Sequence, residues 1–153
     1  MIEITVLSAA FVMGAVIPNE HTCSKGISPP LSWSQVPTGT KSIAVLCDDP
    51  DAPSGDWVHW VLFNLPPDLQ QLEAHVPRSP NLPNGAIQGI NDYHRNGYDG
   101  PCPPPGKKHR YFFKIFALDT RLELDSSARK EDLVEAMQGH ILAKGALMGL
   151  FGR

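Results

Sequence analysis

Three short apolar segments limit the folds open to this chain more than any other feature of its sequence. Residues 41–47 (KSIAVLC) and 57–65 (WVHWVLFNL) are nearly continuous apolar runs with β-branched and aromatic residues, a pattern typical of strands covered on both faces. Residues 109–118 (HRYFFKIFAL) predict a third strand. Because the chain also has 15 prolines and 13 glycines, we expect turns and ordered loops between the strands. The sequence therefore predicts a mainly β protein.

The two-residue period of a strand predicts which side chains share a face. One face of the second segment is expected to carry Trp57, His59, Val61 and Phe63. In the third segment, one face is expected to carry His109, Tyr111, Phe113 and Ile115, and the other Arg110, Phe112, Lys114 and Phe116. Each histidine therefore has an aromatic neighbour on its own face.

Weaker strand patterns and long loops fill the rest of the chain before residue 120. Residues 2–7 and 86–90 have the weaker strand patterns, whereas 77–85 and 92–106 are expected to be loops. Loops of that length are often functional.

The end of the chain carries the clear helical pattern. The residues that recur at helical spacing are Leu133, Met137, His140, Ile141 and Lys144. With Ser126 or Ser127 as a cap, this pattern predicts a helix over residues 130–144. Strands come first and the helix last, without the βαβ alternation of a parallel sheet. We therefore expect a single domain over residues 1–153, a mainly antiparallel β-sandwich with a peripheral C-terminal helix.

Charge and cysteine content exclude some classes of function. The net charge of −3 provides no global basic field for nucleic acid or an anionic membrane, so any anion must be bound locally. The three cysteines, Cys23, Cys47 and Cys102, match no zinc motif and cannot all pair within one chain. We expect them to be reduced, in a cytoplasmic protein.

Residues 4–17 (ITVLSAAFVMGAVI) are apolar enough to suggest a signal peptide. No basic residue precedes them, and the segment is too short to span a bilayer as a helix. It is expected to form a strand, a turn at Gly14 and a second short strand, so no integral membrane segment is predicted.

Residues 48–54 (DDPDAPS) follow the first predicted central strand and are unusually stiff. Pro50 and Pro53 fix their own φ angles and favour extended backbone at Asp49 and Ala52. The segment can therefore hold a carboxylate at a set angle. The alternative interpretation is a turn with solvated aspartates.

Two further segments place histidines beside bulky or rigid neighbours. In WVHW (57–60), His59 lies among aromatic residues, although a strand histidine is often simply a core residue with both ring nitrogens satisfied. In residues 97–111 (GYDGPCPPPGKKHRY), glycines permit close backbone approach to a ligand, and prolines stiffen the loop before His109. The alternative there is a loop that packs over the sheet end, with Lys107 and Lys108 solvated.

Taken together, the three segments contain the parts of a preformed pocket. They supply two strand histidines, a strand-end carboxylate and aromatic walls. Protonated imidazoles donate charged hydrogen bonds, and a carboxylate can fix the tautomer of one histidine. This chemistry suits a small anion.

Motifs around these residues resemble the signatures of the phosphatidylethanolamine-binding protein family. They are DPDAPS (49–54), HW (59–60) and GPCPPPGKKHRYFF (100–113). Three further segments, SAAFVMGAVIP (8–18), SPPLSW (28–33) and GHILA (139–143), are similar to patterns of its prokaryotic Raf kinase inhibitor-like branch. The resemblance spans nearly the whole chain.

The resemblance implies a Greek-key β-sandwich with a rigid conical pocket for phosphate, a phosphoethanolamine-like group or a small carboxylate. Carried over to this sequence, the ligand-binding residues are Asp49, Ala52, Pro53, Trp57, His59, Gly100, Pro104, His109 and Tyr111. It also implies that the Ala52–Pro53 peptide can be cis, since proline lowers the penalty for that isomer, and that a homodimer can form. No cofactor and no metal are expected.

Two departures from eukaryotic relatives limit what can be transferred. Only four residues lie between Pro53 and Val58, where those relatives have a longer insert, and the C-terminal helix is expected to end almost at Arg153. Their roles in kinase binding and flowering signals are therefore not assigned.

The favoured function is a non-catalytic binding module that captures a phosphoryl or carboxylate group of a small ligand, a lipid head group or a partner protein. A kinase or protease is a partner by analogy only. The alternative is a hydrolase that uses His59, His109 and Asp49 as metal ligands or proton shuttles. It is disfavoured because Cys102 is the only plausible nucleophile nearby. A third interpretation is an interaction or structural unit whose pocket is vestigial.

Overall fold

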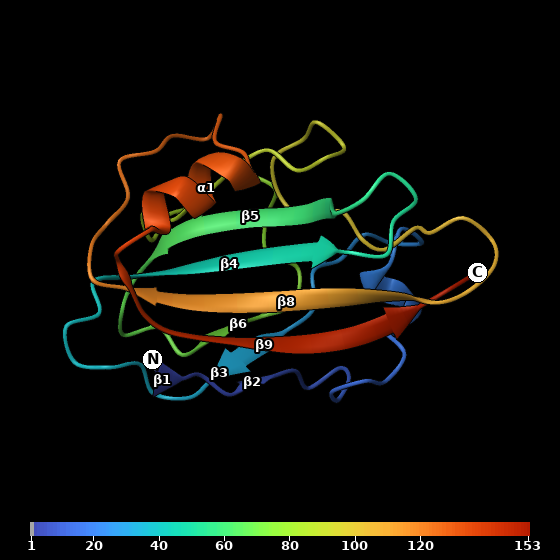
Figure 1. The fold of residues 1–153 in the computed structure, drawn as a ribbon, viewed down its shortest axis with the longest axis horizontal. Coiled ribbons are helices and arrows are strands. Elements are labelled where there is room, and N and C mark those ends of the chain that lie inside the picture. Colours follow the sequence, from blue (N-terminus) through green and yellow to red (C-terminus); the bar gives the residue numbers. More distant parts are fainter. Residues whose placement is uncertain (1) are drawn as a thin grey trace.

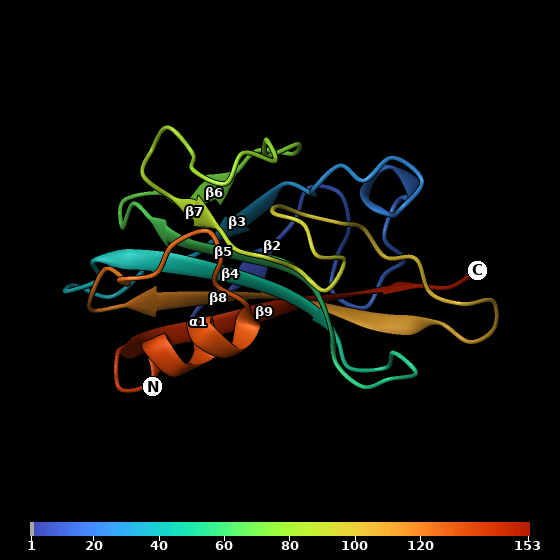
Figure 2. The same cartoon turned by 90° about the horizontal axis from the view of Figure 1, so that it is seen from above.

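The computed structural model describes residues 2–153, which form two β-sheets and one α-helix. Met1, the first residue of the predicted domain, lies outside the described residues. The larger sheet has six strands in the order β1-β9-β8-β4-β5-β7, and the smaller has the order β2-β3-β6. The small sheet lies against one face of the large sheet and the helix α1 against the other (Figure 2). The predicted mainly β architecture is confirmed.

The central strands coincide with the apolar segments of the sequence (Figure 1). The large sheet contains β1 (Ile2–Glu3), β4 (Ser42–Asp49), β5 (Trp57–Leu65), β7 (Ile87–Gln88), β8 (His109–Leu118) and β9 (Ile141–Phe151). The small sheet contains β2 (Val6–Leu7), β3 (Leu31–Trp33) and β6 (Gln71–Leu72); η1 (Asn19–His21) is a short 3-10 helix and α1 spans Lys130–Met137. β4 and β5 form a hairpin, and β8 returns to the other edge of β4. All pairs of strands are antiparallel except β1 with β9.

Strand β4 is buried along its whole length because both of its faces are covered. Ile43, Val45 and Cys47 join the core between the two sheets, whereas Ala44 and Leu46 join a second core under α1. Leu133 and Met137 of α1 complete that second core. A strand covered on both faces is held at a fixed angle at its ends, where Asp49 lies.

The bulge in β5 corrects one sequence prediction. Cys47 pairs with Trp60 and Asp48 pairs with Val58, so His59 is the extra residue. Beyond this bulge the alternation shifts, and Val61 and Phe63 point into the core under α1. Trp57 and His59 instead line a cavity at the strand end. The prediction that all four share a face is therefore wrong for Val61 and Phe63, because a bulge re-aims the side chains that precede it.

The predicted helix over 130–144 begins correctly but ends too late. α1 ends at Met137, and Gly139 adopts a positive φ of 80°, a conformation that glycine favours and that commonly terminates helices. The chain then forms β9, which pairs with the whole of β8. The last element is thus a strand that ends at Phe151, and the helix does not reach the neighbourhood of Arg153. With β9 on one edge and β4 on the other, β8 is an interior strand.

The apolar segment at residues 4–17 contributes side chains to the core between the two sheets. Ile4, Val6, Phe11 and Ile17 are buried. Gly14 has a positive φ of 80°, which confirms the predicted turn, and Val16 then forms a bridge with Leu150 of β9. Within residues 2–153, no helix has the length and apolar composition needed to cross a membrane.

Candidate functional site

The predicted site residues meet where the end of β4 lies beside the starts of β5 and β8, at the right of Figure 1. A cavity of about 330 Å³, here called the strand-end pocket, opens there. It is lined by Asp49, Ala52, Pro53, Ser54, Trp57, His59, Tyr93, Cys102, Pro103, Pro104, His109 and Tyr111. All the predicted ligand-binding residues except Gly100 are therefore brought together, and Ser54, Tyr93, Cys102 and Pro103 are additions.

Gly100 has a packing role close to this pocket. A Cβ at this position would lie 2.3 Å from the backbone of Thr22. The absence of a side chain lets the proline-rich loop lie directly on the segment after η1. Gly100 lines a neighbouring cavity and not the strand-end pocket.

His109 is held by a carboxylate on the adjacent strand. Its Nδ1 lies 2.7 Å from Oδ2 of Asp49, and both side chains are buried. The other oxygen of Asp49 accepts a hydrogen bond of 2.7 Å from the backbone N–H of Asp51. Because a carboxylate accepts, Nδ1 of His109 carries the proton. Nε2 has no hydrogen-bond partner among the described residues, and the ring lines the strand-end pocket.

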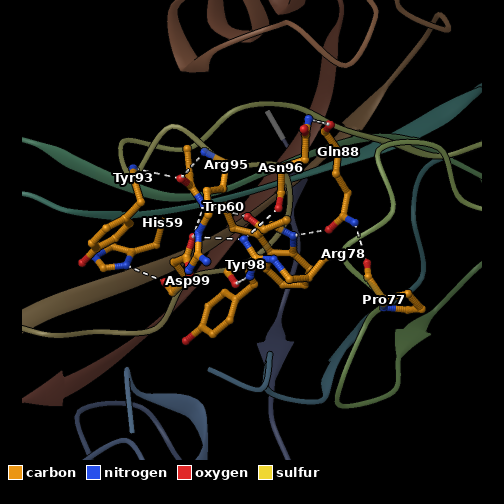
Figure 3. Close-up of polar contacts among 12 residues, drawn as sticks. His59, Trp60, Pro77, Arg78, Gln88, Tyr93, Arg95, Asn96, Tyr98 and Asp99 are labelled. Carbon is orange, nitrogen blue, oxygen red and sulfur yellow. Dashed lines mark hydrogen bonds and ion pairs between the residues drawn. The ribbon is translucent and has the colours of Figure 1, made fainter. Parts of the chain in front are cut away.

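His59 is held in a different way, by a backbone carbonyl from the loop. Its Nδ1 donates to the carbonyl oxygen of Asp99 over 2.6 Å (Figure 3). His59 is buried, and burial lowers the pKa of its imidazole from the usual value. Burial therefore favours the neutral ring, in which Nε2 is an acceptor; on protonation, Nε2 becomes a donor. The ring is tilted against that of Tyr93, with centroids 5.7 Å apart, and T-shaped with that of Tyr111, with centroids 5.3 Å apart.

Asp99 also organises the loop that carries it. Its carboxylate accepts hydrogen bonds from Arg78, Arg95 and Asn91 (Figure 3). Burial opposes ionisation, but these hydrogen bonds and charges lower the pKa of Asp99. The sequence analysis did not predict a role for Asp99. Two of its partners, Asn91 and Arg95, lie within eight residues of it in the sequence and were the available signal.

The stiff segment after β4 is tied to β8 by an ion pair. The guanidinium of Arg110 donates from Nε and Nη2 to the two carboxylate oxygens of Asp51, each over 2.9 Å. These hydrogen bonds lower the pKa of Asp51 to about 2. Among the described residues no peptide is cis, so the Ala52–Pro53 peptide is trans and the cis form allowed by the resemblance is not adopted.

Trp57 leaves a polar atom without a partner. Its Nε1 is the single buried side-chain nitrogen or oxygen in residues 2–153 that makes no hydrogen bond. The ring lines the strand-end pocket and meets Tyr93 edge-on at 5.5 Å. A buried N–H without an acceptor is uncommon and unfavourable. The ring, and not this buried N–H, is what the cavity wall presents.

The prediction that all three cysteines are reduced is wrong. Cys23 and Cys102 form a disulfide that joins residues 79 apart in the sequence. Cys47 is free and buried, and burial raises the pKa of its thiol well above the usual value. The sequence could not predict this pairing because connectivity depends on the tertiary approach of two loops. The disulfide also removes the argument that reduced cysteines gave for a cytoplasmic location.

The side chains around the pocket do not form a metal cluster. Among residues 2–153, no group of three or more His, Cys, Asp or Glu side chains is arranged to hold a metal ion. The disulfide, moreover, leaves Cys102 without the thiolate that nucleophilic attack requires.

Comparisons with known proteins match the chain over most of its length. The family model for phosphatidylethanolamine-binding protein matches residues 7–152. A protein named UPF0098 from Methanothermobacter thermautotrophicus is 56% identical over 138 residues, covering 90% of this chain and 91% of that protein. Its counterpart from Aquifex aeolicus is 46% identical over 151 residues, covering 97% and 88%.

Two solved structures are similar over the whole fold. E. coli YbcL, described as a member of the mammalian PEBP family, has a TM-score of 0.91 and 35% identity, covering 99% of both chains. The Chlamydia trachomatis homologue CT736 has a TM-score of 0.89 and 40% identity, covering 100% of this chain and 99% of that chain.

Proposed function

This chain belongs to the phosphatidylethanolamine-binding protein family, and we propose that it is a binding protein whose strand-end pocket captures a small anion of the phosphate or carboxylate type. The proposal is supported above all by one observation. His59 and His109 are both fixed through Nδ1, by partners that only accept, and both rings line one small cavity. Their Nε2 atoms are left to a ligand.

An anion suits this arrangement better than a neutral or cationic ligand. Protonated imidazoles donate charge-assisted hydrogen bonds, which are shorter and stronger than neutral ones. Because burial lowers the pKa of His59, we expect binding of an anion to favour uptake of a proton by this imidazole.

We propose binding without catalysis, and without a metal or cofactor. The Asp49–His109 pair has the form of a general base with its orienting carboxylate. Neither histidine, however, makes a hydrogen bond to a serine or cysteine of the described residues, and Cys102 is held in a disulfide. This supports the binding module over the hydrolase that the sequence left as an alternative.

The same donors suit an anionic group from several kinds of ligand. A phosphoryl or carboxylate group of a free metabolite, a lipid head group or a partner protein would present the same oxygens. Regulation of a partner kinase or protease is therefore included in the proposal as one use of the same pocket. A cytoplasmic location and a homodimer stay predictions.

The test measures phosphate binding by calorimetry on the wild type and on His59→Ala and His109→Ala variants. We expect each variant to lose roughly 1.5 to 3 kcal/mol of binding free energy, because a charge-assisted hydrogen bond is removed. His140→Ala is the matched control. His140 also pairs with a carboxylate, Asp119, over 2.7 Å, but it is absent from the pocket lining. Unchanged phosphate affinity in both folded pocket variants would contradict the proposal.

A further inference from the structure

A second cavity, here called the loop pocket, adjoins the strand-end pocket. Its volume is about 460 Å³, and Tyr93 and Cys102 line both cavities. The other lining residues are Cys23, Ser24, Lys25, Gly26, Ile27, His75, Val76, Pro77, Arg78, Arg95, Tyr98, Asp99 and Gly100. These two residues are thus common to both walls, so a ligand that occupied both cavities would pass beside them.

The loop pocket has an excess of positive charge. Lys25, Arg78 and Arg95 line it, and Asp99 is the single carboxylate among its lining residues. The side chain of Asp99 is only 11% exposed, whereas those of Arg78 and Arg95 are 42% and 61% exposed. One buried carboxylate therefore balances at most one of three cations, and the groups that a ligand would meet are cationic.

Two of these cationic side chains already make hydrogen bonds within the protein, which limits how many can bind a ligand. Arg78 donates to the backbone carbonyls of Tyr98 and Asn96 as well as to the carboxylate of Asp99 (Figure 3). Its hydrogen bonds therefore mainly hold the loop in place. Arg95 pairs with Asp99 alone and is the more exposed of the two. Lys25 is exposed and has no ion-pair partner in the described residues. Lys25 and the outer edge of Arg95 are therefore the available cationic groups.

Asp99 holds side chains of both cavities in place. The carbonyl of Asp99 accepts the hydrogen bond from His59 in the strand-end pocket, and its carboxylate holds Arg78 and Arg95 in the loop pocket. A single residue thus fixes the histidine at one site and the cations at the other. The position of His59 is thereby linked to that of Arg95 through one residue.

We propose that the ligand is a small molecule with two anionic groups, a phosphate held in the strand-end pocket and a second anion, such as a carboxylate, held beside Lys25 and Arg95. The ligand crosses between the cavities at Tyr93 and Cys102. This inference rests on the proposed function and adds a selectivity to it. A phosphate ester with an anionic tail is preferred over one with an ammonium tail, because like charges repel in the loop pocket.

The experiment compares two matched series of phosphate esters. One series starts with phosphoglycolate and lengthens the chain that bears the carboxylate; the other starts with phosphoethanolamine and lengthens the chain that bears the ammonium group. Affinities are measured by calorimetry beside that of inorganic phosphate. At the best chain length we expect the carboxylate to bind roughly five- to tenfold more tightly than the amine of equal length.

Variants at Lys25 locate the preference. Lys25→Gln should reduce the carboxylate-to-amine affinity ratio, and Lys25→Glu should bring it to one or below. Because Lys25 is exposed, neither change is expected to unfold the protein, whereas Arg95→Gln serves as a second variant whose folding is checked by thermal unfolding. Lys41→Gln is the control, since Lys41 is an exposed lysine just before the opposite end of β4.

The outcomes separate the two proposals. If inorganic phosphate fails to bind, the proposed function is wrong. If phosphate binds but no carboxylate exceeds its matched amine at any length, the two-anion ligand is overturned. A preference that persists unchanged in Lys25→Glu would equally overturn it, because the selectivity would then arise outside the loop pocket.

Discussion

The two walls of the strand-end pocket are built in different ways. One wall is carried by paired strands: Asp49 lies on β4 and pairs with β5, whereas His109 and Tyr111 lie on β8 and pair with β9. The other wall is carried by loops, with Tyr93, Cys102 and Pro103 among its residues. The strand wall is therefore positioned by backbone hydrogen bonds and core packing.

The loop wall has no such ladder and depends on particular side chains. The disulfide ties the proline-rich loop to the segment after η1, and Cys23 donates its backbone N–H to the carbonyl of Pro101. The carboxylate of Asp99 forms ion pairs with Arg78 and Arg95, and its backbone carbonyl accepts a hydrogen bond from His59. A preformed pocket therefore needs a second, independent set of constraints where the sheet stops.

The largest expected effect comes from opening the disulfide. In the chain-entropy view, a bond closing a loop of 79 residues stabilises the fold by roughly 4 kcal/mol. We expect a Cys23→Ser, Cys102→Ser double variant to lose free energy of unfolding of about that size in urea titrations. The loop wall should loosen, while the strand wall keeps its register.

Reduction supplies the control for this measurement. A reducing agent should destabilise the wild type to a similar degree and leave the double variant unaffected, because Cys47 is buried and takes no part in the bond. A loss of less than about 1 kcal/mol in both experiments would show that the loop wall is held mainly by the Asp99 cluster and the prolines.

The strand wall is also the part of the site that the sequence predicted well. Asp49, Trp57, His59 and His109 lie on or beside apolar runs whose strand pattern is local, and antiparallel pairing brings the strand ends together. The bulge at His59 was not predictable, since it depends on how β5 matches β4. Strand β9, which pairs with β8, was not predicted because its residues near Ile141 also fit a helical spacing.

The loop wall was predicted only through its prolines and the family resemblance. Tyr93 gave no signal in the sequence, because its contacts with Trp57 and His59 arise from the folding of a long loop. The disulfide and the Asp99 cluster join residues whose partners are remote or lie in irregular backbone. Such contacts have no periodicity, so they require the tertiary structure.

The next effect contrasts two carboxylates, one for each wall. Asp49 accepts with both oxygens, from His109 and from the backbone of Asp51. Asparagine has one acceptor oxygen, so in Asp49→Asn one of these N–H groups must face an amide N–H. We expect phosphate affinity to fall by roughly 1.5 to 3 kcal/mol in calorimetry.

Asp99→Asn is the matched substitution in the loop wall. The acceptor for His59 is the backbone carbonyl of Asp99, which this substitution keeps. We therefore expect phosphate affinity to change by less than about threefold, whereas the thermal unfolding temperature falls because Arg78 and Arg95 lose their charged partner. Equal losses of affinity in the two variants would mean that the walls do not act separately.

The pH dependence of the site depends on His59, where the two walls meet. Burial lowers the pKa of His59 in the folded protein without ligand, whereas the unfolded chain has a histidine pKa near 6.5. Below about pH 6.5 the unfolded chain therefore binds more protons than the folded one at this residue. Its contribution to stability is present above that pH and is lost as the pH falls through the folded pKa.

A bound anion should reverse this sign, because it favours the protonated imidazole. Sulfate is the suitable probe, since its charge does not change between pH 5 and 8, roughly the range in which histidine titrates. We expect sulfate affinity to weaken as the pH rises, by at most about 1.4 kcal/mol per pH unit for one proton. In a folded His59→Gln variant the slope should decrease, while His140→Ala should retain it. A sulfate affinity that is independent of pH in the wild type would show that the donors of the loop and strand walls act without protonation of His59.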